Sequence, residues 1–189
     1  MFNKIIGNHQ VKEVFRRLLR SQRLPNSLLF VGENGVGKKP FALELAKAFV
    51  CRNPVDGEAC DECSACLRAD KFSIPTNADK NDEFKKVFFS EHPDIGIVTA
   101  YKNNIFIDAI RSLEIESNFR PFEAKGRFFI IDEADKMNDA AANALLKTLE
   151  EPSSTSHIFL LTSRPNALLQ TIRSRCQTVR FAPIDAEDI

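Results

Sequence analysis

Apolar residues along the chain alternate between helical spacing and short continuous runs, which is the pattern of an α/β fold with a parallel sheet. Five short runs are predicted to be strands, at residues 27–31, 94–100, 127–131, 157–162 and 177–181. Apolar positions at helical spacing predict helices at residues 8–23, 38–50, 107–119, 138–151 and 167–172. We therefore expect a doubly wound sheet of five parallel strands, whose ligands bind beyond the carboxyl ends of the strands.

Two adjacent segments interrupt this alternation. Residues 51–72 hold four of the five cysteines, and residues 73–92 are polar and contain proline. We expect residues 73–92 to form a long loop. No internal repeat or low-complexity tract interrupts the 189 residues, a length that fits one domain with a substantial core.

Charge and hydropathy exclude some classes of function. Basic and acidic residues number 26 each, so the formal net charge is zero and gives no argument for nucleic-acid binding by the chain as a whole. No apolar run approaches the roughly 20 residues of a membrane span. The first residues show no basic region followed by a small-residue cleavage site, as a signal peptide would. We expect a cytoplasmic protein without membrane contact.

A glycine-rich turn lies between the first predicted strand and the second predicted helix. It matches G-x-x-x-x-G-K, the Walker A loop, at Gly32, Gly37 and Lys38, with a further glycine at Gly35. Glycines let the backbone curl so that its N–H groups point at phosphate oxygens, and the lysine reaches the β- and γ-phosphates. The alternative is an ordinary glycine-rich turn with a surface lysine, but the strand and helix on either side favour a phosphate loop.

The last position of this motif departs from the pattern. Walker A loops carry Ser or Thr there, whose hydroxyl binds Mg²⁺, whereas this chain has Lys39 followed by Pro40. An ammonium group cannot bind a cation and repels it. We therefore expect that ATP can still bind through the loop and Lys38, and we do not expect efficient Mg²⁺-dependent hydrolysis.

Polar residues close two further predicted strands. Asp132 and Glu133 follow an apolar strand, which is the Walker B arrangement: the aspartate lies at the Mg²⁺ site and the glutamate orients or deprotonates the attacking water. Thr162 and Ser163 end another strand, where a hydroxyl could sense a γ-phosphate. The alternatives are that the acidic pair caps a helix and that the hydroxyls cap a turn.

Four cysteines, Cys51, Cys60, Cys63 and Cys66, follow the spacing C-x8-C-x2-C-x2-C. Four thiolates close a tetrahedral structural zinc site, and C-x2-C pairs supply the tight turn that such sites need. A redox dithiol and a pair of disulfides remain as alternatives. Cys176 is distant in sequence, and we expect it to be packed in the protein and not bound to metal.

Together these motifs resemble AAA+ ATPases of the clamp-loader family, specifically the bacterial delta-prime and gamma/tau subunits. The resemblance covers nearly the whole chain and rests on the order and spacing of several stretches. They are residues 6–8, 24–26, 32–38, 132–135, 143–152 and 171–176. The triplet Ser174-Arg175-Cys176 is the most family-specific of these.

The resemblance implies a three-layered P-loop NTPase core over residues 1–189, with a zinc module inserted at about residues 51–70. It also implies that Arg175 is a trans arginine finger, which completes the ATP site of a neighbouring subunit. A guanidinium suits this role because its positive charge is rigid and permanent; the alternative is an arginine paired to a local carboxylate. Family members carry a lid and a collar after this core, and we expect both to lie outside the 189 residues.

Partners follow from the same resemblance. They are other clamp-loader subunits in a hetero-oligomeric ring and, through that assembly, the sliding clamp and primer–template DNA. The resemblance also implies that nucleotidyl transfer is an activity of the DNA polymerase III assembly. The motifs of this chain include no site for that reaction.

Three functions remain open at this point. The first is a delta-prime-type subunit that lends Arg175 to a neighbouring ATP site and has lost hydrolysis of its own. The second is an active gamma/tau-type motor ATPase, in which Lys38 and Glu133 act despite Lys39. The third is a zinc-containing binding module whose phosphate loop is vestigial.

Overall fold

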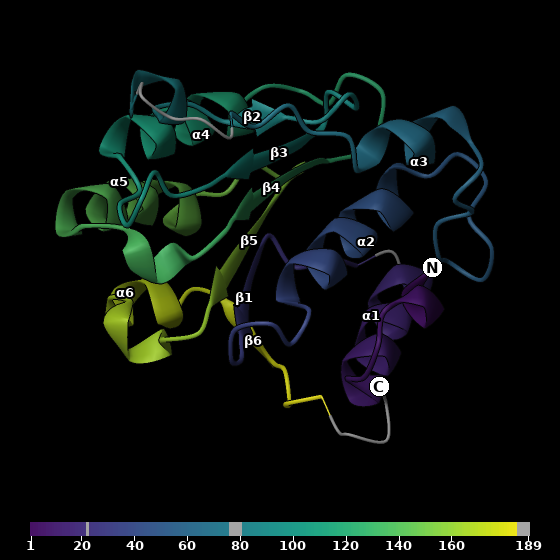
Figure 1. The fold of residues 1–189 in the computed structure, drawn as a ribbon. Coiled ribbons are helices and arrows are strands. Elements are labelled where there is room, and N and C mark those ends of the chain that lie inside the picture. Colours follow the sequence, from purple (N-terminus) through teal and green to yellow (C-terminus); the bar gives the residue numbers. More distant parts are fainter. Residues whose placement is uncertain (22, 76–80, 185–189) are drawn as a thin grey trace.

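A central sheet lies between two layers of helices in the computed structural model, which describes residues 1–21, 23–75 and 81–184 (Figure 1). Helices α1, α2 and α3 cover one face of the sheet, and α4, α5 and α6 cover the other. Their bounds are α1 His9–Ser21, α2 Lys38–Val50, α3 Ser64–Ala69, α4 Ile107–Ser117, α5 Asp139–Glu150 and α6 Gln170–Arg173. None of these helices, in the part of the chain that is described, has the length and apolar character needed to cross a membrane.

The sheet has six strands in the order β2-β3-β4-β5-β1-β6. Their bounds are β1 Ser27–Val31, β2 Phe88–Phe89, β3 Ile95–Val98, β4 Arg127–Ile131, β5 Ser156–Thr162 and β6 Gln177–Arg180. Five strands run parallel, and β2 pairs antiparallel with β3 at one edge. The α/β class is confirmed, but the prediction of five strands is wrong by one, because two residues are too few to show strand periodicity.

The segment between the cysteines and β3 is more structured than expected. In place of one long loop, the described part of residues 73–92 contains a short 3-10 helix at Asn81–Phe84 and strand β2. Helix α3 was also absent from the predicted elements, because its six residues are too few to show helical periodicity. Further 3-10 helices lie at Phe2–Lys4, Ala134–Lys136 and Pro165–Ala167.

Successive residues of the central strands face opposite helical layers. In β1, Leu28 and Phe30 pack in the cluster under α1 and α2, whereas Leu29 and Val31 pack in the cluster under α4, α5 and α6. All five residues of β1 are buried. Strands that are buried on both faces carry apolar residues throughout, so polar side chains emerge only where the strands end.

A buried carboxylate, Asp94, holds the turn that leads from α4 into β4. Its two oxygens accept hydrogen bonds from the backbone N–H groups of Phe122, Glu123 and Ala124 at 2.7, 2.8 and 2.9 Å. Asp94 is 0% exposed, and the Nε atom of the equally buried Arg127 lies 3.8 Å from its Oδ1. One side chain therefore satisfies three backbone donors and faces a buried cation.

We predict that Asp94→Ala lowers the free energy of unfolding by about 3–5 kcal/mol, because it leaves buried donors without an acceptor. Urea denaturation measures the change. As a control, Asp82→Ala removes an exposed carboxylate that pairs with Lys85, and we expect a change within about 1 kcal/mol. Equal effects of the two substitutions would contradict this assignment.

Candidate functional site

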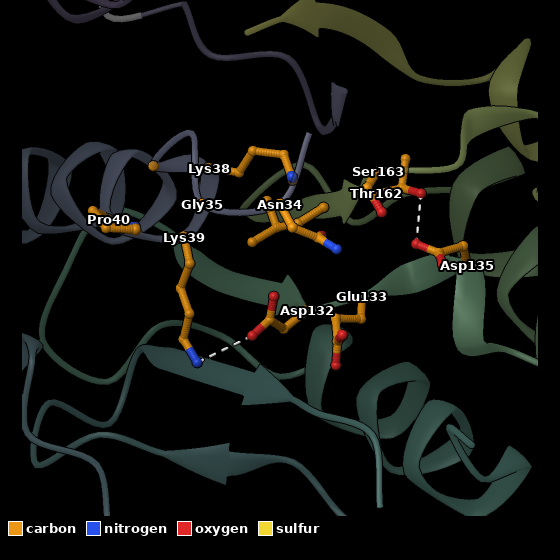
Figure 2. Close-up of a pocket in the computed structure, with 12 residues that line it drawn as sticks. Asn34, Gly35, Lys38, Lys39, Pro40, Asp132, Glu133, Asp135, Thr162 and Ser163 are labelled. Carbon is orange, nitrogen blue, oxygen red and sulfur yellow. Dashed lines mark hydrogen bonds and ion pairs between the residues drawn. The ribbon is translucent and has the colours of Figure 1, made fainter. Parts of the chain in front are cut away.

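A cavity of about 430 Å³ opens at the carboxyl ends of β1, β4 and β5 (Figure 2). The residues that line it come from the phosphate loop, the start of α2, the end of β4 and the end of β5. They are Asn34, Gly35, Gly37, Lys38, Lys39, Pro40, Asp132, Glu133, Asp135, Leu161, Thr162 and Ser163. The structure thus brings together the sequence motifs that were predicted to form one phosphate site.

The phosphate loop needs glycine at three positions for two different reasons. Gly35 and Gly37 have φ angles of +85° and +91°, in the left-handed region that other residues rarely adopt. Gly32 is required by space, because a Cβ there would lie 2.8 Å from the Cβ of Phe181 and 2.9 Å from its carbonyl oxygen. The loop therefore curls as the motif predicts and packs against the end of β6.

Lys38 folds back over this loop. Its Nζ donates hydrogen bonds to the carbonyl oxygens of Gly32 and Glu33 at 2.7 and 2.6 Å. Burial lowers the pKa of Lys38, and the carboxylates of Asp132 and Asp135 oppose that shift. The ammonium is thus held at the mouth of the loop, where the motif places the group that binds β- and γ-phosphates.

Lys39 lies directly beside the Walker B aspartate. Its Nζ is 3.1 Å from Asp132 Oδ2, and Figure 2 shows the lysine extending from the start of α2 to reach this carboxylate. The Lys39 side chain is 41% exposed and that of Asp132 is 21% exposed, so the pair sits at the edge of the cavity. An ammonium group is therefore paired with one oxygen of the Walker B aspartate.

Glu133, the expected catalytic carboxylate, also has a cation of its own. Its backbone adopts a left-handed conformation with φ +53°, and its Oε1 lies 2.7 Å from Lys136 Nζ. A non-glycine residue in this region is strained, which is common at functional sites. Glu133 lines the cavity next to Asp132, as predicted.

Thr162 points at a residue that sequence reasoning left without a role. Its hydroxyl donates to Asp135 Oδ1 at 2.7 Å and accepts the backbone N–H of Arg164 at 3.0 Å. The Arg164 guanidinium pairs with the other oxygen of Asp135. Asp135 lies three residues after Asp132. This short spacing was the feature of the sequence that could have identified Asp135 as a residue of the site.

The four predicted metal ligands converge. The sulfur atoms of Cys51, Cys60, Cys63 and Cys66 all lie within 4.8 Å of one another, and two of the pairs are 4.0 Å apart. A tetrahedral zinc with Zn–S bonds of about 2.3 Å has sulfur–sulfur edges of about 3.8 Å. All five cysteines of the chain are free thiols, so disulfides within the cluster are not formed.

The protein environment acts differently on these thiols. Burial raises the pKa of Cys66, whereas N–H donors, chiefly that of Glu62, lower the pKa of Cys60. At Cys63 burial acts to raise the pKa, but backbone N–H groups outweigh it and lower the value to about 6. Thiolate is the form that binds metal, so the cluster has the donor chemistry of a four-sulfur metal site.

The cysteine segment is tied to the core by charged contacts. Glu58 accepts a hydrogen bond from the backbone N–H of Phe2 at 2.9 Å and another from Arg16 Nε at 2.7 Å. Asp61 lies 2.8 Å from Lys47 Nζ on α2. These contacts fix the module against the N-terminal segment, α1 and α2.

Arg175 lies just after α6 and is not one of the described residues that line the cavity. Its guanidinium donates to the carbonyl oxygen of Thr171 at 2.9 Å and pairs with Glu150 Oε1 at 2.7 Å. Within this chain it therefore forms the local ion pair that was the alternative to a finger. Cys176, next to it, packs in the core under α5 and α6, and burial raises the pKa of its thiol to about 12.

Comparison with known proteins places this architecture in a family. The sequence model of a family described as "DNA polymerase III, delta subunit" matches residues 7–79 and 74–185. The chain belongs to this family of clamp-loader subunits. The resemblance found in the motifs is thereby confirmed at the level of the family.

Relatives of two kinds match this clamp-loader chain. The delta-prime subunits of DNA polymerase III from Bacillus subtilis (strain 168) and Escherichia coli (strain K12) are 33% and 30% identical to it, over 95% and 96% of its length. The tau subunit from Bacillus subtilis is 32% identical over 100% of the chain. The matches cover 49%, 47% and 30% of these relatives, so the chain spans about half of their length or less.

Solved structures agree with the fold. A DNA polymerase III gamma subunit-related protein from Thermotoga maritima superposes with a TM-score of 0.61 at 25% identity, covering 93% of this chain and 46% of that one. A RuvB mutant from Thermotoga maritima gives a TM-score of 0.57 at 13% identity, covering 99% of this chain and 49% of that one. The second likeness shows the fold alone.

Proposed function

We propose that this chain is a delta-prime-type clamp-loader subunit that no longer hydrolyses ATP and lends Arg175 to the ATP site of a neighbouring subunit. It would occupy one position in a hetero-oligomeric ring in the cytoplasm. Through that assembly it would help to load a sliding clamp on primer–template DNA for the replicative DNA polymerase III.

The observation that carries this proposal is the contact between Lys39 and Asp132. At 3.1 Å the ammonium holds the carboxylate that would bind Mg²⁺, and no hydroxyl stands at the position of Lys39 to replace it. Metal-dependent phosphoryl transfer relies on that ion to neutralise charge on the β- and γ-phosphates. The curled loop and Lys38 are retained, so the cavity can still hold nucleotide phosphates without the metal.

Arg175 supports the second half of the proposal. It lies at the surface after α6, and its side chain is 34% exposed. Its partner Glu150 is 50% exposed, and an ion pair this exposed contributes little and is easily exchanged. A triphosphate bound by a neighbouring subunit offers more charge than Glu150, so the guanidinium can leave its local partner for the trans site.

We also propose that the four clustered cysteines bind one structural zinc ion. Four sulfur ligands complete a tetrahedral site and leave no open position for catalysis. The charged contacts of Glu58 and Asp61 then attach the metal module to the nucleotide-binding core.

A gamma/tau-type motor is the second candidate. The similarity to a tau subunit, at 32% identity over the whole chain, favours it as much as the delta-prime likeness does. Lys38, Asp132 and Glu133 all line the cavity, as a motor requires. This candidate predicts Mg²⁺-dependent turnover despite Lys39.

A binding module with a vestigial loop predicts that no nucleotide binds at all.

We predict that Arg175→Ala lowers ATP turnover and clamp loading by at least about tenfold in a loader reconstituted with the full-length subunit, because one ATP site loses its trans cation. Arg175→Lys should be intermediate, since it keeps the charge but loses the planar fork. Arg180→Ala, which removes an exposed arginine from β6, is the matched control and should leave both rates unchanged. Unchanged turnover in Arg175→Ala would sink the finger assignment.

We predict that Lys39→Thr gives the chain Mg²⁺-dependent ATP binding, because it frees Asp132 and supplies a hydroxyl ligand. Calorimetric titration of ATP with and without Mg²⁺ measures this. The native chain should show no gain from Mg²⁺, whereas the variant should gain about tenfold or more in affinity. Tight Mg²⁺-dependent binding by the native chain would instead favour the motor.

We predict one bound zinc per chain, measured by elemental analysis, and a loss of at least about 5 °C in thermal midpoint on its removal by a chelator. Cys63→Ser should lose the zinc, since three sulfur ligands remain. Cys176→Ala should retain it, because that thiol lies in the core and outside the cluster. A metal-free native chain with the same midpoint would contradict a structural zinc site.

A further inference from the structure

The Thr162 hydroxyl is the group expected to sense a terminal phosphate, yet its only proton is already in use. Thr162 ends β5, is 1% exposed and lines the cavity. Its Oγ1 donates to Asp135 Oδ1 at 2.7 Å, and Figure 2 shows the two side chains turned toward each other across the cavity wall. A hydroxyl has one proton to donate, so a second acceptor cannot share it fully.

Asp135 is held as an acceptor. Its side chain is 5% exposed, and two nitrogens of Arg164, Nε at 2.9 Å and Nη2 at 2.8 Å, both contact its second oxygen. Burial acts to raise the pKa of this carboxyl, but Thr162 and Arg164 outweigh it and the pKa is lowered. An ionised carboxylate has no proton to give, so the proton in the contact belongs to Thr162.

The remaining face of the Thr162 oxygen has only lone pairs. One of them accepts the backbone N–H of Arg164 at 3.0 Å. A phosphate oxygen is also an acceptor, so it gains no hydrogen bond from Thr162 in this arrangement. The hydroxyl would have to turn away from Asp135, which would leave a nearly dry carboxylate oxygen without its donor.

We propose that Asp135 is a positioning residue that withholds the Thr162 proton from a terminal phosphate, so that the cavity favours a nucleoside diphosphate over a triphosphate. This rests on the proposal that the phosphate loop still holds a nucleotide, and it is independent of the trans role of Arg175.

The size of the preference for a diphosphate follows from the hydrogen bond between Thr162 and Asp135, which must be lost before Thr162 can donate to a phosphate. Hydrogen bonds to a charged group are worth enough that losing one weakens binding by about ten- to a hundredfold. Lys38 reaches the β- and the γ-phosphate, so it can contact the terminal phosphate of a diphosphate or of a triphosphate. The difference that Asp135 makes falls on the γ-phosphate alone.

The test is calorimetric titration of ADP and of ATP into the chain, in Mg²⁺-free buffer without chelator. The native chain should bind ADP at least as tightly as ATP. Asp135→Ala frees the hydroxyl and should raise the ratio of ATP to ADP affinity about tenfold or more. Asp135→Asn, which keeps a carbonyl acceptor in the same place, should give a smaller rise. Thermal unfolding of each variant verifies that it is folded.

The double variant Asp135→Ala with Thr162→Val separates the hydroxyl from general charge effects. In the Thr162→Val background, Asp135→Ala should leave the affinity ratio unchanged, because no proton is left to release. A rise that persists there, or an equal rise in the Asn and Ala variants, overturns the proposal in favour of charge removal or of a freed Arg164. No rise in Asp135→Ala, or no nucleotide bound by any variant, overturns it too, while the role of Arg175 is judged separately in the reconstituted loader.

Discussion

The parallel register of β1, β4 and β5 is the constraint on which the site depends. Val31 pairs with Thr162 across β1 and β5, and the Gly32 N–H donates to the Thr162 carbonyl at 3.2 Å. On the other side of β5, Ile131 pairs with Leu160, which brings Asp132 to the same edge. The carboxyl ends of parallel strands lie at one edge of the sheet. The phosphate loop, the acidic pair after β4 and the hydroxyls at the end of β5 therefore lie together although they are far apart in sequence.

Within that edge, each acidic side chain has a cationic partner supplied by the same chain. Lys39 faces Asp132 at 3.1 Å, and Lys136 faces Glu133 at 2.7 Å. Arg164 pairs with the third carboxylate of the cavity, Asp135. A magnesium-dependent site depends on carboxylates that are free to bind the ion, whereas here the charges are neutralised internally. The three carboxylates of the cavity are thus paired with cations of the same chain, and the curled phosphate loop lies beside them.

Helix α2 links the two special features of the chain. It begins at Lys38, directly after the phosphate loop, and Cys51 caps its other end. The cysteine cluster therefore lies one helix length from the nucleotide cavity, attached through Lys47 of the same helix. Arg175 follows α6, which covers the opposite face of the sheet (Figure 1). The cysteine cluster, the phosphate loop and the surface arginine thus occupy separate places around one sheet.

By itself, the sequence determined the α/β class, the parallel strands, the phosphate loop, the acidic strand end and the four clustered cysteines, because strand and helix periodicity and motif spacing are local properties. Strand β2 and helix α3 escaped prediction because each is too short to show its period. Only the tertiary structure decided which side chains meet. Lys39 reaches Asp132, and Asp135 accepts the hydrogen bond of the Thr162 hydroxyl, across 93 and 27 residues of sequence respectively. Such contacts depend on how strands align and on which rotamer each side chain adopts, and no local pattern in the chain encodes them.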